Sequence, residues 1–212
     1  TTSTDKNSVT LNLAHDVTTL VATDTAGKLD VAINNMDANV IGTLTATGQK
    51  VTVTGSSSLS VSGADAKTFD ASAATGELIY NVVATGTTQT ISGTTGKNTI
   101  TLGNVADVVS FTGQSGVDTV DVSALALTGT VAAELGGGND VVAFDDLGVG
   151  ATVALDAGAG TDTIKITDGG DLSAMTAAGT WAVSGFEAIQ IVKAADLAVD
   201  TVTATFYGSM LS

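Results

Sequence analysis

The residues of this sequence that could do chemistry are acids at the ends of glycine-rich turns. The two clearest turns, in segments 136–144 and 158–166, begin with alternating glycines and lead into Asp140 and Asp162. In both turns an apolar residue stands two and four positions after the acid. Weaker copies of the pattern lead into Asn98, Asp107 and Asp118.

Turns of this kind suit the binding of calcium. Calcium takes six to eight oxygen ligands at roughly 2.3–2.6 Å, many of them backbone carbonyls. Glycine at alternating positions lets the backbone turn its carbonyls inward at φ values that other residues avoid. The acid adds charge, and the apolar residue after it anchors the turn to a core. The predicted ligands are Asp107, Gly116, Asp118, Gly136, Gly138, Asn139, Asp140, Gly158, Gly160 and Asp162.

The turns resemble the Gly-Gly-x-Gly-x-Asp-x-apolar-x repeats of the RTX family, the calcium-binding β-rolls of proteins exported by type I secretion. The second, fourth, sixth and eighth repeat positions are matched by Gly136, Gly138, Asp140 and Val142, and again by Gly158, Gly160, Asp162 and Ile164. The turn before Asp118 keeps only Gly113, Gly116, Asp118 and Val120.

Two further segments resemble recurrent elements of bacterial surface-layer proteins. They are Val183–Ile191, with its Ser-Gly-Phe-Glu core, and Thr68–Ala73. The resemblance covers about residues 68–192 and is strongest over 113–192. It implies a secreted, calcium-binding protein of the cell surface, in the surface-layer and adhesin group.

The spacing of the turns departs from the family pattern. RTX repeats run in tandem every nine residues, with ions on both edges of an 18-residue coil. Here Asn98, Asp107, Asp118, Asp140 and Asp162 follow one another at intervals of 9, 11, 22 and 22 residues. We therefore expect fewer ions, on one edge only, with some turns empty. The alternative is that these are Gly-Asp turns without metal.

The composition excludes several classes of function. The chain has 22 acidic and 7 basic residues in 212, a formal net charge of −15, and no cysteine. Nucleic-acid binding needs a basic surface, which this chain lacks. The one histidine, His15, cannot supply a two-histidine zinc motif, and we expect it at the surface where a strand ends. We therefore expect no enzymatic activity and no insertion into a membrane.

The apolar residues predict an all-β fold. They recur as pairs two positions apart, roughly every ten residues, separated by Gly, Asn, Ser or Asp. Strands at this spacing fit an antiparallel sandwich or a parallel β-solenoid. In the 22-residue register, Val120, Val142 and Ile164 coincide, and Val131 coincides with Val153. Stacked coils require such a register, so we predict a parallel β-solenoid with Gly-Asp turns.

We expect two regions: a strand-rich region at 1–92, of which 1–67 could be a separate domain, and a calcium-binding β-roll with a C-terminal cap at 93–212. The cap would include Trp181, Phe186 and Phe206-Tyr207, and Asp171–Ala178 could form a helical turn. The expected function is a calcium-stabilised, self-assembling segment of a surface layer, with lattice neighbours and cell-surface polysaccharide as partners. The alternative is a stalk or ligand-binding module of a large RTX adhesin.

Overall fold

The computed structural model describes residues 7–24, 29–83, 88–102, 108–122, 129–144, 152–166 and 180–191. All regular structure in these ranges is β-strand. The strands are β1 (Asn7–Leu13), β2 (Val17–Val21), β3 (Leu29–Asn35), β4 (Asn39–Gly55), β5 (Leu59–Ala74), β6 (Leu78–Val82), β7 (Gln89–Ser92), β8 (Asn98–Leu102), β9 (Val108–Thr112), β10 (Asp118–Asp121), β11 (Thr130–Glu134), β12 (Val141–Phe144), β13 (Thr152–Asp156), β14 (Thr163–Ile166), β15 (Thr180–Ser184) and β16 (Ala188–Ile191).

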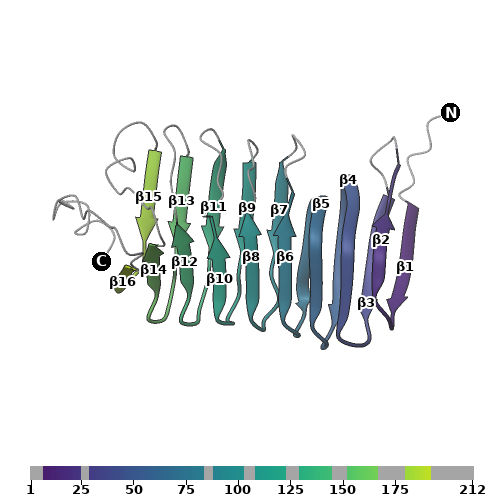
Figure 1. Cartoon of the computed structure of the whole chain (residues 1–212), viewed down its shortest axis with the longest axis horizontal. Helices are drawn as coiled ribbons and strands as arrows, with labels where there is room; N and C mark the ends of the chain where they lie inside the picture. Colours follow the sequence, from purple (N-terminus) through teal and green to yellow (C-terminus); the bar gives the residue numbers. More distant parts are fainter. Residues whose placement is uncertain are drawn as a thin grey trace.

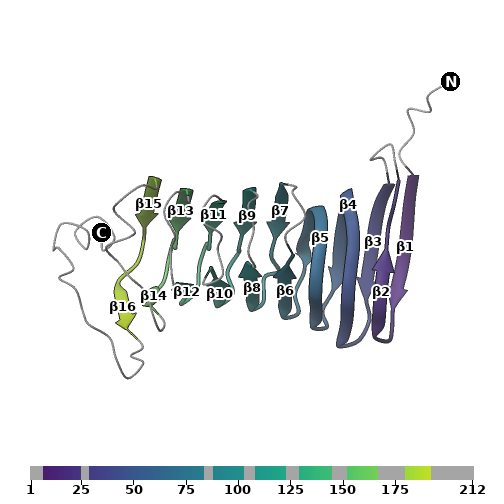
Figure 2. The same ribbon diagram turned by 45° about the horizontal axis from the view of Figure 1, so that its top comes forward.

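The strands form a parallel β-solenoid, as the sequence predicts. From β6 onward each coil contributes one strand to each of two rows, which Figure 2 separates. One row runs β6-β8-β10-β12-β14-β16, and the other runs β7-β9-β11-β13-β15. The long strands β4 and β5 belong to both rows, since β5 pairs with β6 through Leu59–Ala64 and with β7 through Thr68–Asp70. Figure 1 shows the resulting rod, with β1 near one end and β16 near the other.

The 22-residue register predicted from the sequence is confirmed. Val120 lies opposite Val142, and Val142 lies opposite Ile164. On the other row Val131 pairs with Val153 and Glu134 with Asp156. The parallel strand pairing also continues across residues 92 and 93, because β7 pairs with both β5 and β9. The division into two regions at this point stays a prediction.

The core is a thin layer between the two rows. Val, Ile and Leu fill most inward positions, and each stacks on its equivalent one coil away, as Ile100 does on Val120. Phe69 and Tyr80 add an aromatic pair whose ring centroids are 4.4 Å apart. Full burial of one such aliphatic side chain stabilises a fold by about 1.5–3 kcal/mol. The stacked core therefore fixes the height of each coil, and with it the position of each turn.

The expected end features are only partly within the described residues. Phe186 is buried in the core after the last turn, and Trp181 lies in β15 opposite Val153. His15 is exposed between β1 and β2, as predicted. Asp171–Ala178 and Phe206-Tyr207 lie outside the described residues, as does Asp107.

Over the described ranges, no helix is long and apolar enough to cross a membrane.

Candidate metal centre

The solenoid brings the residues at the ends of the glycine-rich turns into one column. Each stands at the first position of a strand in the row β8-β10-β12-β14-β16, or directly before it, and the neighbouring strands of this row lie side by side in Figure 1. Asn98 pairs with Asp118 in the strand register. We call the whole series the acid ladder; its rungs are Asn98, Asp118, Asp140, Asp162 and Glu187.

One carboxylate oxygen of each acidic rung binds the coil before it. The backbone N–H of Asp118 donates to Asp140 Oδ1 at 2.7 Å, and the N–H of Asp140 donates to Asp162 Oδ1 at 2.7 Å. The N–H of Asp162 donates to Glu187 Oε2 at 2.8 Å. The N–H of Asn98 likewise donates to Asp118 Oδ1 at 3.0 Å. These bonds fix the side chains in a row along the solenoid axis.

The other oxygen of three rungs has no hydrogen-bond partner. Oδ2 of Asp118, of Asp140 and of Asp162 is buried, and the described residues supply no donor to any of them. All three residues are 0% exposed. A buried oxygen of a charged group without a partner is unfavourable by several kcal/mol unless a proton or a cation reaches it.

The electrostatics of the ladder agree with this geometry. Loss of hydration on burial raises the pKa of Asp118 from 3.8 to about 7, and the negative charge of Asp140 adds to the increase. Burial raises the pKa of Asp140 to about 6, with a further contribution from Asp162. Burial and the charge of Glu187 raise the pKa of Asp162. Each of the three carboxylates is therefore harder to charge, chiefly because it is buried and in smaller part because the next coil carries another acid.

The glycines of the turns are required by close stacking. Gly138 and Gly160 have φ of 144° and 159°, in the region that disfavours other residues. A Cβ on Gly160 would overlap the carbonyl oxygen of Gly138, and one on Gly138 would overlap that of Gly116. A Cβ on Gly136 would in the same way overlap the carbonyl oxygen of Gln114, and one on Gly158 would overlap that of Gly136. Carbonyl oxygens of one coil therefore lie directly against the turn glycines of the next coil, where only glycine fits.

The predicted ligands do not all join the ladder. Asp118, Asp140 and Asp162 do, and the predicted glycines form the turns around them. Asn139 is exposed, and its Oδ1 accepts a hydrogen bond from the N–H of Thr161 at 3.0 Å instead.

Glu187 is a rung that the spacing of the turns did not predict. It follows Asp162 by 25 residues rather than 22, but it directly precedes Ala188, which pairs with Thr163, and so occupies the position equivalent to Asp162 on the next coil. The position of a glutamate in the Ser-Gly-Phe-Glu segment, directly before an alternating strand, was the available signal.

The acid ladder offers a divalent cation some of the ligands that it needs, but not a complete set of side chains. Among the described residues there is no group of three or more His, Cys, Asp or Glu side chains that could hold one metal ion. A ladder supplies carboxylates in pairs, one from each of two adjacent coils, so the remaining ligands would have to be turn carbonyls. The three unpartnered oxygens are the feature that favours a cation here.

Comparison of the chain with protein-family models, with curated proteins and with solved structures gave no match. What the fold and the site define is a class: a parallel β-solenoid with a buried acid ladder along one corner.

Proposed function

We propose that this chain is a structural module of the extracellular cell surface, stiffened by calcium bound along the acid ladder. The observation that carries the proposal is the set of three unpartnered carboxylate oxygens on successive coils, at residues that are 0% exposed. Without cations the ladder stacks like charges in a protein whose net charge is already −15.

The spacing of parallel strands favours calcium over magnesium. Neighbouring strands lie about 4.8 Å apart, so equivalent oxygens on successive coils are separated by about twice a calcium–oxygen distance. Magnesium requires about 2.0–2.1 Å and near-octahedral geometry, and would need the coils to approach each other. Asp118, Asp140, Asp162 and Glu187 are the residues that would hold calcium, which would neutralise the carboxylates and tie adjacent coils together.

Shape and composition support a structural role. The chain has a net charge of −15, and extracellular calcium modules bind at roughly 10⁻⁴–10⁻³ M, which suits an ion supplied by the medium. We infer that the intact protein assembles with copies of itself in a surface layer, since bound calcium lowers the repulsion between acidic chains. The RTX resemblance of the turns supports export by type I secretion.

Thermal unfolding tests the calcium part of this proposal. We expect melting curves in EGTA and in millimolar calcium to differ by many degrees, and magnesium to replace calcium poorly. One site at 100-fold excess over its dissociation constant adds about 2.7 kcal/mol. Identical curves in all three buffers would contradict calcium binding and leave the glycine turns with a purely structural role.

The elongated fold also suits the stalk of a large adhesin. Electron microscopy of the full-length protein with and without calcium distinguishes the two roles. Ordered sheets that dissolve in EGTA would support a surface layer. Single extended particles at both calcium levels would favour the stalk.

A further inference from the structure

The acid ladder ends at Asn98, where the column changes from acidic to apolar. On the coil before Asn98 the equivalent residue is Leu78, and Leu59 precedes it. Asn98 is therefore the boundary between two leucines and three aspartates, and it is itself 0% exposed.

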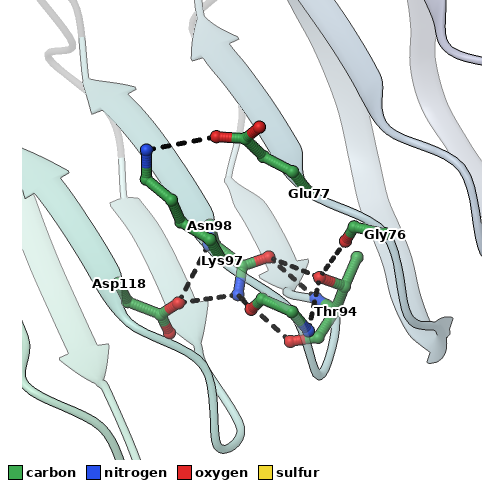
Figure 3. A network of polar contacts seen from close by, with 7 residues as sticks. Gly76, Glu77, Thr94, Lys97, Asn98 and Asp118 are labelled. Carbon is green, nitrogen blue, oxygen red and sulfur yellow. Dashed lines mark hydrogen bonds and ion pairs between the residues drawn. The ribbon is translucent and has the colours of Figure 1, made fainter.

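The side chain of Asn98 has all of its polar atoms engaged (Figure 3). Its Nδ2 lies 3.1 Å from the carbonyl oxygens of Thr94 and Gly96, and 2.8 Å from Asp118 Oδ1. Its Oδ1 accepts the N–H of Thr94 at 2.8 Å. One amide group thus has three oxygens around it, two from the turn of its own coil and one from the next rung.

The turn of Asn98 also carries a positive charge. Lys97 precedes Asn98 and pairs with Glu77 of the preceding coil, with 3.2 Å between Nζ and Oε1 (Figure 3). The residues that precede the three aspartate rungs are uncharged: Val117, Asn139 and Thr161. The turn of Asn98 therefore differs from those of the aspartate rungs in two ways, by its amide group and by a lysine that is paired with Glu77.

We propose that Asn98 is a neutral terminator of the ladder, whose amide group takes the place of a cation between coils. Cation positions then begin between Asp118 and Asp140, and none lies between Asn98 and Asp118. This inference rests on the proposed calcium binding, and deepens it by setting where the bound ions stop.

The chain offers a matched control in Asn39. Asn39 stands in the same column, is 4% exposed, and pairs with Leu59 rather than with an acid. Its Nδ2 also has three oxygen acceptors: Leu13 O, Asn35 Oδ1 and Asp37 O. The substitutions Asn98→Asp and Asn39→Asp therefore remove similar amides, but only the first creates two adjacent carboxylates.

The experiment counts bound calcium in the purified chain by titration calorimetry and by atomic emission after dialysis. We expect Asn98→Asp to bind one calcium ion more than the wild type, and Asn39→Asp to bind the same number as the wild type. A wild type that binds calcium while Asn98→Asp gains none would overturn the terminator role alone. A wild type that binds no calcium would overturn the proposed function, and this inference with it.

The reciprocal variant Asp118→Asn covers the case in which Asn98→Asp fails to fold. It moves the terminator by one coil, so we expect one calcium ion fewer and, in EGTA, a higher melting temperature than that of the wild type. Loss of an ion with a lower melting temperature in EGTA would overturn the terminator role, because the new amide would then not satisfy the rung.

Discussion

The substitution Asp140→Asn separates the two consequences of a buried acid ladder, because its effect on stability should change sign with calcium. Without calcium the Asp140 carboxylate is buried between two other acids, and burial raises its pKa to about 6 from 3.8. At pH 8 this difference corresponds to about 3 kcal/mol of unfavourable free energy. The asparagine amide that replaces the carboxylate is buried as well and loses hydration in its turn, so we expect a net gain of about 1–2 kcal/mol.

An asparagine already occupies the equivalent position two coils earlier, where the amide of Asn98 donates hydrogen bonds to the carbonyl oxygens of Thr94 and Gly96. In EGTA at pH 8, Asp140→Asn should therefore melt roughly 2–8 °C above the wild type. In saturating calcium the Asp140→Asn protein lacks the calcium positions on both sides of residue 140. Each bound ion would contribute about 2.7 kcal/mol of stability, so this variant should melt below the wild type.

The assay is thermal unfolding followed by circular dichroism in both buffers. Asp156→Asn is the matched control, since Asp156 is exposed in the same region of the chain and loses the same charge. We expect the control to stay within about 0.5 kcal/mol of the wild type in both buffers. An Asp140→Asn protein that melts below the wild type in EGTA, by the same margin as in calcium, would refute the reasoning.

Three further predictions concern pH, glycine and the core. In EGTA the stability should fall as the pH rises from 5 to 8. The pKa of Asp118 is about 7 in the folded protein and 3.8 ordinarily, so the folded protein binds more protons than the unfolded chain in this pH range. The melting temperature measured as a function of pH checks this, and a flat or rising profile would contradict it. Gly138→Ala should destabilise the folded protein by more than about 2 kcal/mol, because the new Cβ would overlap Gly116 O. Gly137→Ala should change the stability little, because the nearest atom to its Cβ would be Ala159 O at 3.7 Å. Urea unfolding compares the two variants, and equal effects would be evidence against close stacking of the turns. Tyr80→Phe should be neutral or stabilising by about 1 kcal/mol, since the buried hydroxyl has no partner among the described residues; a marked loss of stability in the same urea assay would show that the hydroxyl has one.

The sequence predicted the fold because stacking repeats the same requirement on every coil. Val120, Val142 and Ile164 share one inward position, and a period of 22 residues was therefore visible without the structure. The long strands β4 and β5 were less predictable. Their apolar pairs are spaced as in short strands, but the backbone continues around the corner through an irregularity between Ala46 and Lys50.

The three aspartates of the site were also predictable, whereas the state of their oxygens was not. The Gly-x-Asp pattern marks Asp140 and Asp162 as turn residues whether or not metal binds. That each Asp gives one oxygen to the previous coil and leaves the other without a partner depends on three-dimensional register. Glu187 was not predicted because additional residues before it break the 22-residue period. Asn98 was recognised as the end of a weak copy of the turn, but its role depends on hydrogen bonds that the sequence does not show.

The most direct test of calcium binding along the acid ladder is a crystal structure grown in millimolar calcium at pH 8, with the anomalous signal of calcium recorded. We predict anomalous peaks between the rungs Asp118 and Asp140, between Asp140 and Asp162 and between Asp162 and Glu187, within about 2.3–2.6 Å of the carboxylate oxygens. No peak is predicted between Asn98 and Asp118. A ladder with no anomalous peak, in which a turn group donates to each Oδ2, would contradict the account.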